Sequence, residues 1–177
     1  MSDYITISYF KTPVGELILG SLGNQLCLCD WRYRKMRDSV DKRIKKGLNK
    51  EFNIGLSEVI ENAKLQLNEY FSDKRTEFDI PLLLVGTDFQ QSVWRELQTI
   101  PFGKTNSYLE LSQKMENEKA IRAVATANGA NAISILIPCH RIIGIDGSLV
   151  GYAGGLEAKK KLLELEGAIS NIQIKLF

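Results

Sequence analysis

Hydrophobic and polar positions alternate along most of the first thirty residues, which is the pattern of strands with one buried face. Residues 4–10, 16–21 and 25–30 are each rich in β-forming side chains. A proline and a glycine lie in residues 12–15, and a Gly23-Asn24 pair separates the second segment from the third. Because such short turns join neighbouring strands, we predict an antiparallel sheet at the start of the chain.

The next pattern along the chain is helical. Residues 32–50 carry nine lysine and arginine side chains, and we expect this helix to end near Gly47. Its basic residues fit either a solvated helix face or a DNA contact. Hydrophobic side chains recur every three or four positions in residues 57–71, which predicts a second helix. A polar stretch then ends at Pro81, so we predict an N-terminal domain over residues 1–82 and a C-terminal domain over residues 83–177.

A helical pattern resumes at Asp88, which with Gln91 matches a capping box. The predicted buried stripe of this helix consists of Phe89, Val93, Leu97 and Ile100. Further on, Ser107 with Glu110 repeats the capping pattern, and Asn117 can cap a helix over residues 118–128. Two short helices joined by a tight turn are typical of a helix-turn-helix, whose second helix enters a DNA groove.

The second of these short helices has one smooth face. Ala120, Ala123 and Ala127 are three and four positions apart, and Arg122 lies beside them. Small side chains allow a helix backbone to approach DNA closely, while a long basic side chain reaches past it. The same alanines also suit tight packing on a neighbouring helix, so the pattern alone leaves both interpretations open.

An apolar run at residues 133–137 leads into the adjacent pair Cys139-His140. His140 is the only histidine of the chain, so any imidazole chemistry must use it. A reactive cysteine needs a base or a positive field, but neighbours on an extended chain point apart. A sharp turn or a bridging water is therefore required, and Glu166 is a candidate partner for the histidine. The alternative is a buried cysteine that only packs.

The last part of the chain predicts a hairpin at Asp146-Gly147, a glycine-rich loop over residues 151–155 and a helix over residues 157–165. Hydrophobic positions alternate in residues 172–176, which could form an edge strand.

Composition limits the classes of partner. The chain is 44% hydrophobic and 25% charged, as in ordinary globular proteins. It has no apolar run of the ~20 residues that cross a bilayer, and its first residues lack the features of a signal peptide. We therefore expect a cytoplasmic protein with reduced thiols and no membrane partner. Its net charge is only +2, so nucleic-acid binding would require a local basic face.

The cysteines do not suggest a metal site. Cys27, Cys29 and Cys139 with a single histidine form no convincing tetrahedral zinc set, so we expect no metal. Cys27 and Cys29 fall in an apolar run on one face of a predicted strand, and we interpret them as packing residues.

Two mechanisms fit the Cys139-His140 pair. A Cys-His hydrolase would also need an acidic or amide partner and an oxyanion hole. A cysteine that accepts a group from a DNA base would need a flipped-out base and a helix docked on the duplex.

A series of short motifs in one order distinguishes these mechanisms. The motifs are Phe89-Gln90, Val93-Trp94, Ile100-Pro101 with Gly103, Ser107-Tyr108 with Leu111, Arg122-Ala123-Val124, Asn131, Pro138-Cys139-His140-Arg141, Gly151-Tyr152-Ala153-Gly154-Gly155 and Leu162-Leu163 with Glu166-Gly167. The series resembles the O6-alkylguanine-DNA alkyltransferases (methylated-DNA–protein-cysteine methyltransferases), especially the constitutive bacterial type. The match is dense over the second half of the chain and holds only in outline over the first third.

The resemblance implies an α+β chain, with a small β-rich, ribonuclease H-like N-terminal domain and a helical, winged helix-turn-helix C-terminal domain. It implies a monomeric, single-turnover DNA repair methyltransferase that uses no cofactor. Such a protein flips O6-alkylguanine, and O4-alkylthymine, out of duplex DNA and transfers the alkyl group irreversibly to its own cysteine. A non-catalytic lesion-binding DNA module is the alternative, although alkyltransferase-like proteins lack the cysteine that is present here.

The resemblance also implies roles for single residues. Cys139 would accept the alkyl group, His140 would deprotonate it through a water, and Glu166 would orient His140. Tyr108 would donate a proton to N3 of the flipped guanine.

The same resemblance implies DNA contacts and a pocket for the base. Arg122 would fill the gap in the base stack, Ala123 and Ala127 would lie in the minor groove, and Asn131 would act as a hinge. The base pocket would be formed by Ile142, Tyr152 and Ala153, with backbone groups that include Cys139.

Two positions depart from the family pattern. Ala132 follows Asn131 where the family commonly has proline, which predicts a less rigid hinge. Ala125 replaces a common glycine, which predicts only tighter packing.

Overall fold

A computed structural model describes residues 2–170 of the chain. The chain folds into two compact units that divide between Gly86 and Thr87, and each is described separately below. We expected the first domain to end at residue 82, whereas the first unit continues to Gly86. Within residues 2–170, no helix combines the length and apolar character that crossing a membrane requires.

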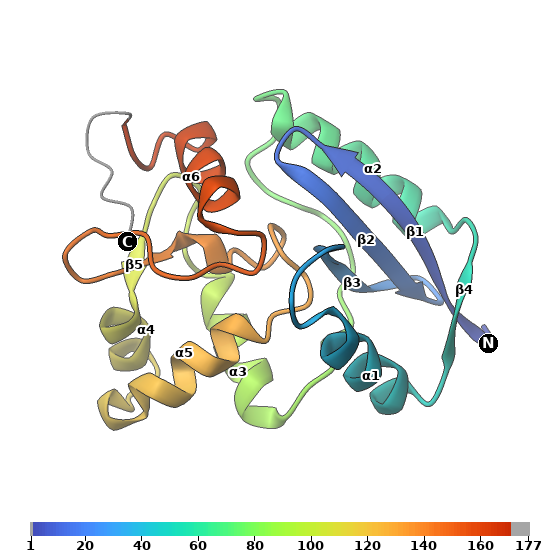
Figure 1. Cartoon of the computed structure of the whole chain (residues 1–177), viewed down its shortest axis with the longest axis horizontal. Helices are drawn as coiled ribbons and strands as arrows, with labels where there is room; N and C mark the ends of the chain where they lie inside the picture. Colours follow the sequence, from blue (N-terminus) through green and yellow to red (C-terminus); the bar gives the residue numbers. More distant parts are fainter. Residues whose placement is uncertain (1, 171–177) are drawn as a thin grey trace. The chain divides into compact units, whose positions relative to one another are not determined.

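The first unit is built on a four-stranded sheet with the order β3-β2-β1-β4 (Figure 1). Its strands are β1 (Tyr4–Thr12), β2 (Gly15–Leu22), β3 (Gln25–Trp31) and β4 (Glu51–Ile54). The first three pair antiparallel through two-residue turns, as their alternating pattern and turn residues predicted. β4 was not predicted, and it pairs in parallel with β1.

Two helices complete the first unit. The basic segment forms α1 (Arg37–Leu48), and the periodic segment forms α2 (Glu58–Phe71), as predicted. The hydroxyl of Ser57 caps α2 by accepting a hydrogen bond from the backbone N–H of Ile60 at 3.2 Å. α2 lies across β1, β2 and β3 and buries the apolar stripe of its inner face against them (Figure 1).

The free edge of β3 is covered by the end of the first unit. The N–H of Leu26 donates to the carbonyl of Pro81 at 2.8 Å, and the N–H of Leu83 donates to the carbonyl of Leu26 at 2.9 Å. These bonds satisfy backbone groups of an edge strand, so residues 81–83 belong with the sheet rather than with a linker.

The second unit is mainly helical. Its described elements are α3 (Asp88–Leu97), β5 (Asn106–Ser107), α4 (Tyr108–Lys114), the 3-10 turn η1 (Glu118–Ala120), α5 (Ile121–Gly129), the 3-10 turn η2 (Cys139–Arg141), β6 (Ile142–Ile143) and α6 (Leu156–Leu165). α3, α4 and α5 pack on one another, α6 packs on η2, and β5 pairs in parallel with β6 (Figure 1). A sheet-based N-terminal unit followed by a helical C-terminal unit confirms the predicted α+β fold class.

The start of α3 differs from the prediction by one residue. The capping box is formed by Thr87 and Gln90, through hydrogen bonds of 3.1 and 3.0 Å, and not by Asp88 and Gln91. Phe89 is 37% exposed and so does not belong to the buried stripe, while Val93, Leu97 and Ile100 do.

The predicted helix-turn-helix has an irregular turn. Ser107 and Glu110 form the predicted capping box at the start of α4. The side chain of Asn117 makes no capping hydrogen bond, and the next three residues form η1. The second helix therefore begins at Ile121 rather than at residue 118.

The turn predicted at Asp146-Gly147 is present. The N–H of Gly144 donates to the carbonyl of Ser148 at 2.8 Å and closes it. The strand before this turn, β6, pairs with β5. The edge strand expected at residues 172–176 lies outside the described residues.

Candidate active site

The apolar run before the cysteine is folded by Asn131. The side-chain amide of Asn131 donates to the carbonyl of Ile137 at 2.9 Å, and its carbonyl oxygen accepts from the N–H of Ile133 at 2.9 Å. Both bonds are buried, so they bind the two ends of residues 133–137 together. Ile135 adopts φ 72°, so the run turns instead of forming a straight strand.

This folded run delivers Cys139 and His140 on the 3-10 turn η2. The N–H of Arg141 donates to the carbonyl of Pro138 at 3.0 Å and closes the turn. A 3-10 turn is much tighter than an extended strand, so it supplies the sharp bend that the adjacent thiol and imidazole require. The cysteine is only 4% exposed, and His140 is fully buried.

His140 is paired with a buried carboxylate. Its Nε2 lies 2.7 Å from Oε1 of Glu166, and both side chains are fully buried. Arg141 holds the same carboxylate with two hydrogen bonds, from Nε to Oε2 at 2.9 Å and from Nη2 to Oε1 at 3.0 Å. A carboxylate held by an imidazole and a bidentate guanidinium has little freedom to rotate, so Glu166 fixes the orientation of the His140 ring.

Burial and hydrogen bonding act in opposite directions on the pKa of Glu166. Burial raises that pKa, but hydrogen bonds and positive charge from His140 and Arg141 prevail and lower it from 4.5 to about 2. Glu166 is therefore ionised at neutral pH and accepts a hydrogen bond from the Nε2–H of the imidazole.

The pKa of His140 is lowered from 6.5, chiefly because burial disfavours the imidazolium, although Glu166 opposes this effect. The ring is therefore neutral at pH 7, with its hydrogen on Nε2 and a lone pair on Nδ1. That Nδ1 is buried and forms no hydrogen bond within residues 2–170. Nδ1 is consequently the atom of His140 that can take up a proton.

The loop after α3 supports the same carboxylate from another side. The N–H of Gly103 points at Oε2 of Glu166 across 3.4 Å, and Nη1 of Arg141 donates to the carbonyl of Ile100 at 2.6 Å. Gly103 has φ +78°, and a Cβ there would lie 3.0 Å from the backbone oxygen of Glu166. Only glycine combines this backbone conformation with this close approach.

Tyr108 lies at the first position of α4. Burial and the negative charge of a Cys139 thiolate raise the pKa of Tyr108, while a hydrogen bond with Asn128 lowers it slightly. Its hydroxyl is therefore protonated at neutral pH and can act as a hydrogen-bond donor.

The second helix of the helix-turn-helix has a packed side and an exposed side. The indole N–H of Trp94 donates to the carbonyl of Ala127 at 2.8 Å, and Ala127 is only 2% exposed. Arg122 and Ala123 are exposed. Ala127 thus lies on the side of α5 that packs on α3, and the side that is open to a partner presents Arg122 and Ala123.

The residues predicted to wall the base pocket lie near His140 or on the strand after it. The ring of Tyr152 is edge-on to that of His140, with the ring centres 6.4 Å apart and the planes at 79°. Ile142 is buried in β6, directly after η2, and Ala153 follows Tyr152 in the glycine-rich loop.

A buried lysine ties these segments together. Nζ of Lys159, on α6, donates to the carbonyls of Ile142, Val150 and Gly151. Burial lowers the pKa of Lys159 to about 8, and the negative charge of a Cys139 thiolate opposes that shift. Three carbonyl acceptors satisfy the ammonium, so Lys159 holds the glycine-rich loop against β6.

The comparisons with known proteins agree with this arrangement. Residues 5–84 match the family described as 6-O-methylguanine DNA methyltransferase, ribonuclease-like domain, and residues 88–168 match the DNA binding domain of the same protein family. A methylated-DNA–protein-cysteine methyltransferase from Methanosarcina acetivorans is 39% identical over 159 residues, which cover 90% of this chain and 96% of the relative. The chain belongs to the methylated-DNA–protein-cysteine methyltransferase family.

Two other relatives extend the comparison. The protein of the same name from Mycobacterium tuberculosis is 52% identical over 112 residues, which cover 63% of this chain and 68% of the relative. The crystal structure of Mycobacterium tuberculosis OGT in complex with DNA superposes with a TM-score of 0.78 at 39% identity, covering 92% of this chain and 93% of that chain. The similarity to methyltransferases of this family therefore extends through both units of the chain.

For a methyltransferase of this family, the predicted site residues fall into two groups. Cys139, His140 and Glu166 belong to one buried cluster, and the negative charge of a Cys139 thiolate contributes to the raised pKa of Tyr108. Arg122 and Ala123 lie on the exposed side of α5, whereas Ala127 and Asn131 are buried and serve the packing of the second unit.

Two residues of the candidate site were not identified from the sequence. The sequence indicates Arg141 only as part of the Pro138-Cys139-His140-Arg141 motif, and Lys159 was not predicted. The signal for Lys159 was present, because Lys159, Leu162 and Leu163 lie at helical spacing on the buried face of α6, in line with the buried C-cap residue Glu166. A lysine within such a stripe indicates a buried ammonium with carbonyl or carboxylate partners.

The remaining cysteines serve packing. Cys27 and Cys29 are buried in β3, and burial raises the pKa of both thiols, for Cys27 to about 12. A thiol with so high a pKa carries almost no thiolate at neutral pH and is a poor nucleophile. No group of three or more candidate metal ligands occurs among residues 2–170.

Proposed function

We propose that this protein repairs DNA by transferring an alkyl group from O6 of guanine to Sγ of its own Cys139, once per molecule. The observation that supports this most strongly is that Cys139 and His140 share one tight turn and that the imidazole of His140 is paired with the buried carboxylate of Glu166. A Cys-His pair alone would fit several reactions. Membership of the methyltransferase family therefore supports alkylated DNA as the substrate of this pair.

In this proposal His140 activates the cysteine. The thiol proton passes through one water to Nδ1 of His140, the imidazole nitrogen that has no hydrogen bond from residues 2–170. The resulting imidazolium is stabilised by the carboxylate of Glu166, 2.7 Å from Nε2. Arg141 keeps that carboxylate ionised and in place.

The thiolate then attacks the alkyl carbon of the flipped base. The S–C bond forms as the bond between O6 and that carbon breaks, and the electron pair of the broken bond stays with guanine. Tyr108 donates its hydroxyl proton to N3 of the departing guanine and regains a proton from the imidazolium through solvent. In total, the thiol hydrogen is exchanged for the alkyl group, and a thioether remains on Cys139.

The DNA partner in this proposal is a duplex that contains O6-alkylguanine, or O4-alkylthymine, which presents the same O-alkyl group beside a ring nitrogen. Ala123 would approach the minor groove, and Arg122 would fill the place of the flipped base. Ile142, Tyr152 and Ala153 would enclose the base, and Asn131 would hold the turn that carries the cysteine. All these residues belong to one chain, so we propose that the protein acts as a monomer.

The test is incubation with duplex DNA that contains O6-methylguanine, followed by intact mass measurement. We expect one methyl group on wild-type protein, and none on Cys139→Ala, which should still bind the duplex. A wild-type protein that binds this DNA but leaves the lesion intact would instead be a lesion-binding module. Repeated turnover of an ester or amide substrate would indicate a hydrolase.

A further inference from the structure

The basic segment at residues 32–50 has no role in the proposed reaction, and the structure divides it into two sets of side chains. Arg34 and Arg37 form ion pairs with the buried carboxylate of Asp30, at 3.1 and 3.0 Å. Arg32 pairs with Glu16 at 3.0 Å. Arg37 also pairs with Asp41 at 2.8 Å, so the three arginines are balanced by three carboxylates of the first unit.

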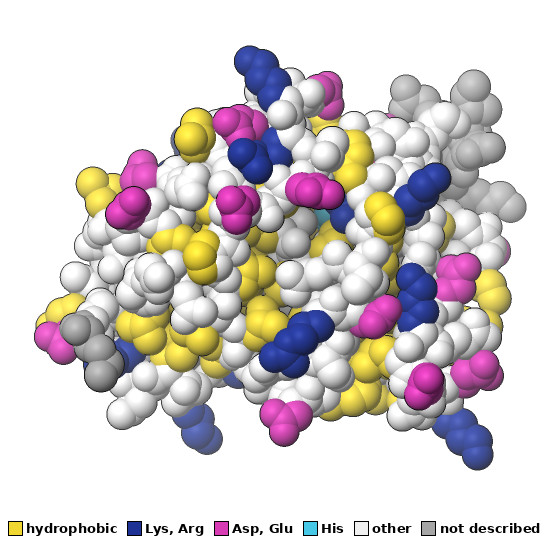
Figure 2. Space-filling view, turned by 180° about the vertical axis from the view of Figure 1, so that it is seen from behind, with side chains coloured by type: hydrophobic (Ala, Val, Ile, Leu, Met, Phe, Trp, Pro, Cys, Tyr) yellow, Lys and Arg dark blue, Asp and Glu magenta, His cyan; other side chains and the backbone are white. Residues whose placement is uncertain are grey.

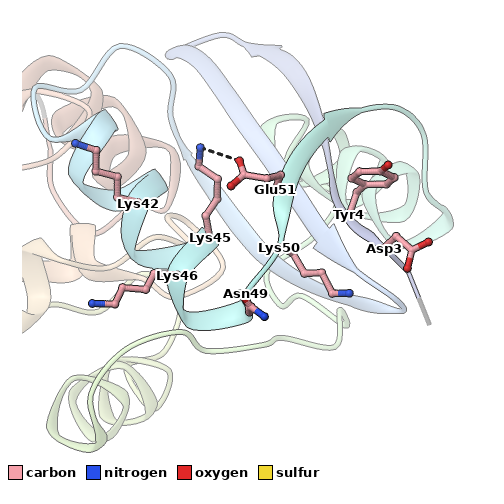
Figure 3. Close-up of a pocket in the computed structure, with 8 residues that line it drawn as sticks. All are labelled: Asp3, Tyr4, Lys42, Lys45, Lys46, Asn49, Lys50 and Glu51. Carbon is pink, nitrogen blue, oxygen red and sulfur yellow. Dashed lines mark hydrogen bonds and ion pairs between the residues drawn. The ribbon is translucent and has the colours of Figure 1, made fainter.

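The lysines at the other end of the segment are arranged differently. Lys42, Lys45, Lys46 and Lys50 line one hollow of about 700 Å³ at the end of α1 (Figure 3). Lys45 pairs with Glu51 across 3.4 Å. Within residues 2–170, the side chains of the other three lysines form no ion pair and no hydrogen bond.

Helix electrostatics do not explain all of these lysines. Lys45 and Lys46 lie in the last turn of α1, where a positive charge is favourable next to the helix C-terminus. Lys42 lies before that turn and Lys50 lies after the helix, so the helix C-terminus does not account for the positions of these two lysines. The N–H of Asn49 already caps the helix by donating to the carbonyls of Lys45 and Lys46.

The spread of the ammonium groups indicates the kind of partner. Lys42 and Lys46 extend to the same side of α1, and Lys50 extends in another direction (Figure 3). Lys42 and Lys46 are one helical turn apart, about 6 Å along the axis. Such spread cations do not converge on a small anion, but they suit a row of phosphates, which follow one another every ~3.4 Å along a DNA strand.

Positive charge predominates among the residues that line the hollow. Figure 2 shows a face on which basic, acidic and hydrophobic side chains are interspersed, without one large basic area. Within the hollow four lysines meet two carboxylates, Asp3 and Glu51, and Lys45 neutralises the second of these. Lys42, Lys46 and Lys50 then face one remaining carboxylate, Asp3, which leaves a local excess of two positive charges.

We infer that Lys42, Lys46 and Lys50 form a second DNA contact, which binds the phosphate backbone of duplex DNA without reading its sequence. The inference rests on the proposed action on DNA and extends it to the N-terminal unit. Lysine suits this role, because its ammonium is a flexible point charge without the planar geometry that recognises one base or one carboxylate.

The experiment measures the salt dependence of binding to an undamaged duplex. The triple variant Lys42→Gln, Lys46→Gln, Lys50→Gln is compared with wild type and with a matched control, Lys11→Gln, Lys35→Gln, Lys74→Gln. The control removes the same charge from three exposed lysines of the first unit that do not line the hollow.

The logarithm of the binding constant decreases linearly with the logarithm of the salt concentration. We expect the steepness of this line to be smaller by about 2 to 3 in the triple variant, because each lost phosphate contact reduces it by ~0.9. The slope of the control variant should differ from the wild-type slope by less than about 1. Equal slopes for the two triple variants would overturn the inference.

Alkyl transfer from O6-methylguanine as a free base provides the second measurement. We expect the triple variant to keep the wild-type rate, because its lysines lie outside the active site. A lower rate with the free base would also overturn the inference, because the lysines would then act on the chemistry or the fold. Failure of wild type to transfer a methyl group from a duplex that contains O6-methylguanine would instead refute the proposed function.

Discussion

Nε2 of His140 lies 2.7 Å from Oε1 of Glu166, with both side chains fully buried. The bond joins a 3-10 turn to the end of α6, and Arg141 holds the carboxylate at the same time. Because Glu166 is ionised, it directs the proton of the neutral ring to Nε2 and leaves Nδ1 as the base. The geometry thus determines which nitrogen of the only histidine can serve Cys139.

The first prediction concerns the pKa of His140. Burial lowers this pKa from 6.5, while the hydrogen bond and charge of Glu166 raise it. We therefore expect a folded-state pKa below 6.5 in the wild type and a still lower value in Glu166→Gln. NMR can measure both directly, because the chain contributes one histidine ring signal. An equal or higher pKa in the variant would show that Glu166 does not stabilise the imidazolium.

The same groups set the direction of the pH dependence of stability. A group whose folded pKa is depressed stabilises the fold above its unfolded pKa, and that contribution is lost as the pH falls. For His140 the loss begins below about 6.5, and for Glu166 it extends from about 4.5 down to about 2. The free energy of unfolding should therefore decrease on acidification from neutral pH, and His140→Gln should remove the part of this decrease that begins near pH 6.5.

The second prediction concerns Tyr108, which we expect to protonate the departing guanine. Tyr108→Phe should lower the rate of methyl transfer by about 10²-fold, because one donor to the developing negative charge is lost. The measurement is single-turnover transfer from a duplex that contains O6-methylguanine, at protein concentrations that saturate the DNA. A wild-type rate in Tyr108→Phe would exclude the hydroxyl as the proton donor.

The third prediction concerns Arg122, whose proposed role is to fill the place of the flipped base and therefore requires a duplex. Arg122→Ala should lower transfer from duplex DNA by at least about tenfold, since unstacking a base costs a few kcal/mol and the side chain would offset part of it. Transfer from O6-methylguanine as a free base should not change. A similar loss with both substrates would show that Arg122 supports the fold or the chemistry and not base flipping.

The fourth prediction concerns the clamp formed by Lys159. Lys159→Met removes a charged donor from three buried carbonyls, so the free energy of unfolding should fall by about 2 kcal/mol. Lys161→Met is the matched control, because Lys161 is exposed on the same helix and its pair with Glu157 is long, at 4.0 Å. For this control, urea unfolding should show a decrease in the free energy of unfolding of less than about 0.5 kcal/mol. Equal decreases in the free energy of unfolding in the two variants would contradict a stabilising role for the hydrogen bonds of Lys159.

Local patterns predicted most elements of the fold, and the failures have identifiable causes. β1, β2 and β3 alternate and are joined by short turns, so their pairing could be inferred from neighbouring residues. β4 has only four residues, and it pairs in parallel with a strand far away in the sequence. No local period marks such a strand. The start of α5 was misplaced because Asn117 has the right chemistry for a cap but makes no capping bond.

The site shows the same division between local and distant information. The sequence identifies Cys139 and His140, since a single histidine beside a cysteine is a local feature. Glu166 could be named only as a candidate or through the family resemblance, because its contact joins residues 26 positions apart. The alanines of α5 also differ in burial, which the sequence pattern alone does not indicate. Ala123 is exposed and Ala127 is packed on Trp94, although both belong to one predicted stripe.

The most direct measurement is the number and position of methyl groups after reaction with excess duplex that contains O6-methylguanine. We predict that transfer stops at one methyl group per protein molecule and that peptide mapping places it on Cys139. Repair of several lesions by each protein molecule, or a methyl group on Cys27, Cys29 or any residue other than Cys139, would contradict this mechanism.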